Sequence, residues 1–147
     1  MNNKILRRSY QKKIDLFKRT MIEPPSQGWI KTLREIFGMT TTQLAKKLNI
    51  SQPRVIKMEQ NEKNLKISTL EKIADELCCD FVYAFIPREK INDIIHKQAK
   101  KCALKILNRV NKNMSLENQL SESEEILEDL IEDLLDGNIS KIWNEDN

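Results

Sequence analysis

Residues 40–60 read TTTQLAKKLNISQPRVIKMEQ, and this stretch determines how the chain around it folds. It holds two short helical patterns separated by about three residues. Thr40 is expected to cap a first helix that ends at Leu48, and Ser51 a second that ends near Gln60, because hydroxyl oxygens accept the free N–H groups of a first helical turn. Two helices joined this closely predict a helix-turn-helix.

The small and apolar residues of this stretch predict how the two helices pack. Ala45 is small at the point where the helices cross, and Ile50 and Val55 fill the wedge that sets their angle. Pro53 falls in the first turn of the second helix, where a missing N–H is tolerated. The pattern therefore favours a fixed crossing of two short helices.

Neighbouring helices complete a compact bundle. Residues 29–37, WIKTLREIF, have helical periodicity and end at Gly38, a typical C-terminal stop. Ser68 is expected to cap the helix that follows, TLEKIADELC. The side chains predicted to point inward are Trp29, Ile30, Leu33, Ile36 and Phe37 in the first of these helices and Leu70, Ile73, Ala74 and Leu77 in the second.

Such a bundle presents the N-terminal end of the second motif helix outward, where it fits a major groove about 12 Å wide. Gln52, Pro53 and Arg54 lead that helix. Glutamine can pair bidentately with adenine and arginine with guanine, whereas proline offers only apolar contact, best suited to a thymine methyl. The helix tip therefore predicts sequence-specific binding to double-stranded DNA.

Residues 29–78 resemble the Cro/CI-type, XRE-like helix-turn-helix domain of phage repressors and many bacterial regulators, through the string LREIFGMTTTQLAKKLNISQPRVIKMEQ. In that family an arginine of the first helix pairs with a glutamate at the end of the recognition helix, and the matching residues are Arg34 and Glu59. This pair is expected to be structural. Thr41 stands where the family often has a phosphate-binding glutamine, so Thr41 or Gln43 is expected to replace that contact.

The same resemblance implies particular DNA contacts. The base-reading positions are Gln52, Pro53 and Lys57, with Arg54 beside them, and each good base contact contributes ~1–3 kcal/mol of discrimination. Lysines 46, 47, 63 and 66 are expected to contact phosphates, which set affinity but not sequence. The DNA-binding candidates are thus Gln52, Pro53, Arg54, Lys57, Thr41, Gln43, Lys46, Lys47, Ser51 and Lys63.

Two flanking motifs carry a more specific resemblance. PPSQGWI at residues 24–30 and FVYAFIP at residues 81–87 enclose the helix-turn-helix, and the whole is similar to the bacterial family called mobile mystery protein A. That resemblance implies a gene on mobile elements, encoded beside a Fic-domain protein. It further implies a toxin–antitoxin module in which this chain is the antitoxin and transcriptional autorepressor.

The fold class expected is mainly α: a Cro/CI-type bundle with an N-terminal helix, one short β-strand and a C-terminal helical extension. Residues 1–27 are interpreted as a basic amphipathic helix, over residues 4–22, and a linker. Residues 28–79 are the DNA-binding domain. Residues 80–147 are interpreted as a strand plus helices for dimerisation or partner binding.

The strand is predicted over residues 80–86 because they are mainly aromatic and β-branched. A lone strand needs a partner for its backbone groups. The simplest partner is the same strand in a second copy, and the alternative is irregular chain that continues the core. A helical pattern over residues 88–112 follows, then a break near Asn113–Ser115 and an acidic helix that Gly137 is expected to cap.

Charge is polarised along the 147 residues. Residues 1–66 carry a net charge of +10 and residues 113–147 a net charge of −10, although the whole chain is only +3. The basic part suits a polyanion, and the acidic part suits either solvent or a basic protein surface.

The composition also excludes several classes. No apolar run approaches the ~20 residues of a membrane span, and no signal peptide is evident, so a cytoplasmic protein without membrane contact is expected. Three cysteines, with an adjacent pair and no CxxC spacing, are interpreted as buried free thiols rather than a metal site. One histidine and no phosphate-binding loop argue against an enzyme, and no cofactor is expected.

Two hypotheses about function remain compatible. The first is a homodimeric repressor on a palindromic operator, because two half-sites require a two-fold partner. The second is that the acidic C-terminal segment docks on a Fic-domain toxin through its Leu/Ile face, while its carboxylates meet a basic surface. The alternatives are a stand-alone repressor of a mobile element, or an acidic helix that packs on its own domain or on the second subunit.

Overall fold

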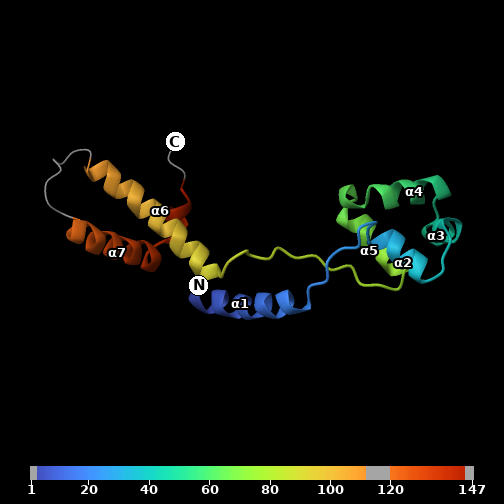
Figure 1. The fold of residues 1–147 in the computed structure, drawn as a ribbon, viewed down its shortest axis with the longest axis horizontal. Coiled ribbons are helices and arrows are strands. Elements are labelled where there is room, and N and C mark those ends of the chain that lie inside the picture. Colours follow the sequence, from blue (N-terminus) through green and yellow to red (C-terminus); the bar gives the residue numbers. More distant parts are fainter. Residues whose placement is uncertain (1–2, 112–119, 145–147) are drawn as a thin grey trace. The chain divides into compact units, whose positions relative to one another are not determined.

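A computed structural model describes residues 3–111 and 120–144 of the chain (Figure 1). The described part is mainly helical, as predicted. It forms two compact units, one of residues Thr20–Phe85 and the other of residues Met1–Arg19 with Ile86–Asn147. No helix among the described residues is at once long and apolar enough to cross a lipid bilayer.

The unit Thr20–Phe85 is a bundle of short helices around one core. Its elements are α2 (Trp29–Ile36), α3 (Thr41–Leu48), α4 (Gln52–Gln60), the 3₁₀ turn η1 (Glu62–Asn64) and α5 (Ile67–Glu76). One apolar side of each α-helix faces the others. The buried residues of this core are Ile30, Leu44, Ala45, Val55, Ile73 and Leu77.

Three of these helices end in left-handed residues. Gly38 after α2 has φ +64°, and Asn49 after α3 and Cys78 after α5 both have φ +54°. In each case the next N–H reaches back five residues, as Ile50 N does to the Ala45 carbonyl at 3.0 Å. Each of these hydrogen bonds provides a donor for a carbonyl near the end of the helix. The predicted stop at Gly38 is confirmed.

Two details of the predicted helices were wrong. Trp29, Ile36 and Phe37 were expected inside, but all three are exposed, and Ile36 is 70% exposed. An eight-residue helix buries one face only, and Ile30 and Arg34 occupy the centre of that face. Helix α5 begins at Ile67, before the Ser68 cap that the sequence predicted.

The early start of α5 has a backbone cause. Lys66 is the extended residue at the N-cap, and its carbonyl already accepts the N–H groups of Thr69 and Leu70 at 2.9 and 3.0 Å. No side chain caps the helix. The hydroxyl of a serine was therefore a misleading signal here, because the chain is already helical when it reaches Ser68.

The strand predicted at residues 80–86 is not present in the single chain. Residues 79–87 follow α5 without helix or strand, and across the described ranges no backbone hydrogen bond joins residues 81–86 to another backbone group. A strand exists only as part of a ladder, and within residues 3–111 and 120–144 no second strand lies beside the segment. Its composition favours a strand, but in the described residues the segment has no pairing partner.

The second unit is built on a helical hairpin. Helices α6 (Ile91–Asn111) and α7 (Leu120–Asp136) pack together, and η2 (Ile139–Trp143) folds back onto both (Figure 1). Gly137 donates its N–H to the Asp133 carbonyl at 3.0 Å at the end of α7. The break predicted near Asn113–Ser115 lies outside the described residues. The buried centre of the hairpin is formed by Ala99, Ala103, Ile131 and Ile142.

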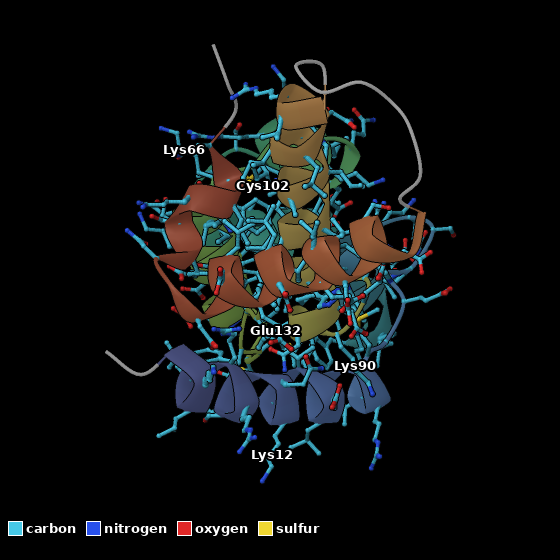
Figure 2. All side chains as sticks on the ribbon, turned by 90° about the vertical axis from the view of Figure 1, so that its left-hand side faces the viewer. Lys12, Lys66, Lys90, Cys102 and Glu132 are labelled. Carbon is cyan, nitrogen blue, oxygen red and sulfur yellow. The ribbon has the colours of Figure 1, made fainter. Side chains whose placement is uncertain are left out.

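Helix α1 (Asn3–Thr20) belongs to this unit and is attached by polar contacts. Gln11 Oε1 accepts the Ile91 N–H at 2.9 Å, and Lys4 Nζ pairs with Asp136 Oδ1 at 3.1 Å. Figure 2 shows charged side chains of α1, Lys12 among them, extending away from α6 and α7. The helix also leaves several apolar side chains exposed, namely Ile5, Leu6, Tyr10 and Leu16.

A half-buried carboxylate holds the start of α2. Glu62 Oε1 accepts the Trp29 N–H at 3.1 Å, and the Ile30 N–H also donates to this carboxylate. A Cβ at Gly28 would lie 2.0 Å from Glu62 Oε2 and would displace this carboxylate, and the φ of +87° at this position also favours glycine. Burial raises the pKa of Glu62, and the two backbone donors oppose that shift.

This pKa shift predicts a pH dependence of stability. A folded pKa above the unfolded value means that the contribution of Glu62 is fully present below pH about 4.5 and falls as pH rises through the folded pKa. Glu62→Gln removes that titration but keeps an acceptor for the Trp29 N–H. We therefore expect the variant to gain stability relative to the native chain between pH 4 and 7.

The measurement is urea unfolding in a Trp143→Phe background, so that fluorescence reports Trp29 alone, since the chain has two tryptophans. All other carboxylates are shared by the two chains and cancel in the difference. A difference that stays constant with pH, or that favours Glu62 more as pH rises, would contradict the assignment.

Candidate nucleic-acid interface

The α3–turn–α4 motif is held together by a capping box at the start of α3 and by the backbone conformation of the turn. Thr40 Oγ1 accepts the Gln43 N–H at 3.2 Å, while Gln43 Oε1 accepts the Thr40 N–H at 2.8 Å. This capping box closes the start of α3. Asn49 then turns the chain in a left-handed conformation, which asparagine tolerates. The predicted Thr40 cap and the boundary at Leu48 are confirmed.

The core beneath the motif matches the predicted packing. Ala45 and Val55 are buried, and Ile50 packs against them from the turn. Because α3 and α4 share this apolar contact, the angle between the two helices depends on the small Ala45 of α3 and on the branched side chains of Val55 and Ile50. The opposite side of α4 is left to solvent.

An ion pair ties α2 to the end of α4. Arg34 Nε donates to Glu59 Oε1 at 2.5 Å, and Arg34 Nη2 donates to Glu59 Oε2 at 3.2 Å. Arg34 Nη1 also donates to the Met39 carbonyl at 2.8 Å, just before α3. The Arg34 residue is 8% exposed. The hydrogen bond to Glu59 raises the pKa of Arg34 further above its ordinary value, against the effect of burial.

The tip of α4 is exposed and oriented by a neighbour. Ser51 occupies the N-cap position with extended backbone, but its hydroxyl makes no cap hydrogen bond, so the predicted side-chain cap at Ser51 is wrong. Pro53 lies in the first turn as predicted. Gln52 Nε2 donates to Thr41 Oγ1 at 2.9 Å, which links the first residues of the two helices. The side chain of Gln52 is thereby held in one direction while its carbonyl oxygen stays available.

The other predicted DNA-binding residues fall into two groups. Arg54 and Lys57 lie exposed on α4, and among the described residues no ion pair or hydrogen bond engages their side chains. Gln43 is exposed, but its side-chain oxygen is engaged in the capping box. The lysines predicted to contact phosphate are all exposed, on α3, on η1 and just before α5, and are Lys46, Lys47, Lys63 and Lys66.

In residues 41–66 the basic side chains are exposed, whereas the acidic side chains are engaged in contacts within the unit. Eight charged residues lie between residues 41 and 66, and the six basic ones are all exposed. The two acidic ones turn inward, Glu59 to Arg34 and Glu62 to the start of α2. The surface around α3, α4 and η1 is therefore uniformly positive although the whole chain is near neutrality, which suits a polyanionic ligand.

Sequence reasoning missed two of these contacts. The Thr40-x-x-Gln43 spacing is a capping-box signature and could have revealed that Gln43 is engaged. The Thr41–Gln52 hydrogen bond joins residues eleven positions apart on different helices. It depends on the crossing angle, so no local pattern predicts it.

A fold in which a small helical bundle presents one exposed, positively charged helix tip defines a DNA-binding protein of the helix-turn-helix class. Comparison with known families agrees, because a sequence model of the family described as Helix-turn-helix matches residues 30–83. A search of curated proteins and a search of solved structures each found no match. The chain thus carries a helix-turn-helix domain and is a DNA-binding transcription regulator.

The buried ion pair generates a prediction about stability. Arg34→Ala leaves the Glu59 carboxylate buried without its cation and the Met39 carbonyl without its donor, so we expect a loss of ~3–5 kcal/mol. Glu35→Gln is the matched control, since Glu35 lies 3.8 Å from the same guanidinium but is half-exposed. That variant is expected to change stability by less than about 1 kcal/mol.

The double variant Arg34→Met/Glu59→Leu distinguishes the charge from the packing. With no stranded charge, it should recover most of the loss. Urea unfolding followed through Trp29 fluorescence measures all three variants. A loss in Arg34→Ala no larger than that in Glu35→Gln would show that the pair does not stabilise the bundle.

Proposed function

We propose that this regulator is a sequence-specific transcriptional repressor that binds a palindromic operator as a homodimer. We propose further that it is the antitoxin and autoregulator of a toxin–antitoxin pair with a Fic-type toxin. The observation that carries the DNA-binding part is the tip of α4, where Gln52, held by Thr41, and Arg54 are both exposed.

Each residue at this tip has a role that follows from its chemistry. Gln52 offers its amide to an adenine edge, and the hydroxyl of Thr41 keeps that amide from rotating freely. Arg54 and Lys57 suit guanine, and Pro53 suits a thymine methyl. The surrounding positive residues, with the free hydroxyl of Ser51, hold the phosphate backbone and set the register of the helix in the groove.

Replacing the arginine at the tip tests this assignment. Arg54 is exposed, and among the described residues no hydrogen bond or ion pair engages its side chain, so Arg54→Ala should abolish specific operator binding while leaving the melting curve unchanged. Sites are first selected from random DNA with the native protein, and gel shifts then compare a selected site with unrelated DNA.

The matched control is Lys72→Ala, which removes an exposed positive charge from α5, outside the motif. It should weaken binding to both DNAs by similar, small factors, because phosphate contacts carry no sequence information. Unaltered affinity of Arg54→Ala for the selected site would refute the base-reading role of this residue.

The antitoxin role is supported by the PPSQGWI and FVYAFIP motifs that resemble the mobile mystery protein A family. The structure changes how a toxin would be bound. Leu127, Leu130 and Leu134 of α7 already pack against α6, so the Leu/Ile face of this helix is occupied within its own unit. The exposed carboxylates remain available for a basic partner, and they are Glu124, Glu125, Glu128, Asp129, Glu132 and Asp133 (Figure 2 labels Glu132).

This arrangement predicts that charge, rather than the apolar face, carries toxin binding. Neutralising Glu128, Asp129, Glu132 and Asp133 to their amides should leave folding and DNA binding intact and weaken co-purification with the adjacent Fic-domain protein at least tenfold. Neutralising Glu71 and Asp75 on α5 is the control and should change neither activity.

Retained toxin binding in the α7 variant would move the toxin contact elsewhere on the chain. Failure of the native chain to co-purify with the Fic-domain protein would favour the alternative, a stand-alone mobile-element repressor. Deletion of residues 115–147 is a poorer test of this point. It removes Ile131 and Ile142, two of the four buried residues of the hairpin, and so disrupts α6 as well.

A further inference from the structure

The segment between α5 and α6 exposes apolar side chains on an unpaired backbone. Residues 80–88 read DFVYAFIPR. Val82 is 67% exposed, Tyr83 62% and Phe85 97%. In the described parts of the chain, no backbone group of residues 81–86 bonds to another backbone group. Such a segment is a template for strand addition, and it needs a defined partner to be kept from indiscriminate pairing.

The sequence of this segment is complementary to itself in reverse. Counting outward from Ala84, Tyr83 is matched by Phe85, an aromatic pair, and Val82 by Ile86, a β-branched pair. Three residues out, Phe81 is matched by Pro87, which is apolar but not aromatic, and four residues out, Asp80 is matched by Arg88, a pair of opposite charge. An antiparallel pairing centred on Ala84 would therefore place like apolar residues opposite each other and close both ends with ion pairs. These are the cross-strand pairs that stabilise antiparallel ribbons.

We propose that two copies of the chain dimerise through this segment as a two-stranded antiparallel ribbon, with Ala84 of one copy opposite Ala84 of the other. The inference rests on the proposed function in one respect, because a palindromic operator requires a two-fold arrangement of the chain. It identifies the surface and the register, and an antiparallel ribbon of identical strands has the necessary two-fold axis.

The position of Pro87 selects between the two hydrogen-bonding patterns that this register allows. In an antiparallel pair, residues alternate between those that bond the partner strand and those that point their N–H outward. If Ala84 bonds its counterpart, so do Val82 and Ile86, and Pro87 falls on the outward edge. A proline lacks the N–H for a ladder and is tolerated only there. The pattern with Ala84 as a hydrogen-bonded pair is therefore the one compatible with Pro87.

The side chains then divide by alternation into two faces. One face carries Val82, Ala84 and Ile86 between the terminal charges, and the other carries the rings. Phe81 and Tyr83 already stack, with centroids 6.1 Å apart. In the ribbon, Phe85 of the second copy joins them, so the exposed aromatic surface of one chain is covered by the aromatic surface of its partner.

A charge-swap experiment on the full chain tests both the partner and the register. Asp80→Arg opposes two arginines at each end of the ribbon, and Arg88→Asp opposes two aspartates. Each variant alone should weaken self-association about tenfold or more in sedimentation equilibrium without DNA. The double variant Asp80→Arg/Arg88→Asp restores opposite charges and should return the dissociation constant to within about threefold of the native value.

Two further variants serve as controls. Asp75→Arg makes the same charge change on the exposed surface of α5 and should leave self-association unchanged. Ala84→Pro removes the central N–H of the ladder and should abolish dimerisation, whereas Pro87→Ala on the outward edge should not reduce it.

A monomeric native chain at about 100 μM, single variants without effect, or a double variant no better than the singles would each overturn the ribbon. Recovery in the double variant cannot arise from misfolding of the singles. Failure of the ribbon is also distinguishable from failure of the DNA-binding proposal. The Arg54 variant reports on the α4 tip, and native binding to a selected half-site is measured separately from self-association.

Discussion

The geometry of the DNA-binding unit depends on one buried guanidinium. Arg34 connects three separate places: the end of α4 through Glu59, the loop before α3 through the Met39 carbonyl, and its own helix α2. Both carboxylate oxygens of Glu59 and two nitrogens of Arg34 are committed to this one pair. A buried pair of this quality holds its partners in a single arrangement, since any slip leaves charge without a counter-charge in a poorly solvated place.

The ion pair also shapes the electrostatics of the surface that faces the ligand. Because Glu59 is satisfied from within and Glu62 is consumed by the start of α2, neither carboxylate adds negative charge around the exposed face of α4. The lysines and Arg54 are left to dominate there. A chain with a net charge of only +3 can thus present a strongly positive patch, because the acids of this segment perform internal structural tasks.

The helix-turn-helix itself was largely predictable, because its signals are local. The cap at Thr40, the stop at Gly38 and the spacing of Leu44, Ala45 and Val55 all act within a turn or two of the chain. The pairing of Arg34 with Glu59 came from resemblance, not from any local pattern. What sequence reasoning could not reach was set by tertiary geometry, such as the Thr41–Gln52 bond across the helix crossing.

The errors have the same origin. Trp29, Ile36 and Phe37 look like core residues by composition, but a helix of two turns has room for one buried face, and which face wins is decided by its neighbours. The cysteines show the limit of composition in another way. Cys78 was expected inside as a buried thiol, yet it is exposed, because it occupies the left-handed position that ends α5. The residue type cysteine does not indicate that Cys78 would be the left-handed residue that ends α5.

The segment DFVYAFIPR shows that a local preference for a strand and the formation of a strand are different properties. Its β-branched and aromatic residues indicate a strand, but a strand is a property of a pair, and the part of the chain that the structure describes supplies no second strand for it. Exposed rings beside backbone amides that have no partner in the chain make a monomer prone to associate with other chains. The residues on either side of Ala84 are complementary to each other when the segment is paired with a second copy in reverse. Contact between two copies is therefore the simplest explanation of these exposed residues. On this proposal, the β-branched and aromatic pattern predicts a strand that forms only between two copies, and a single chain does not contain it.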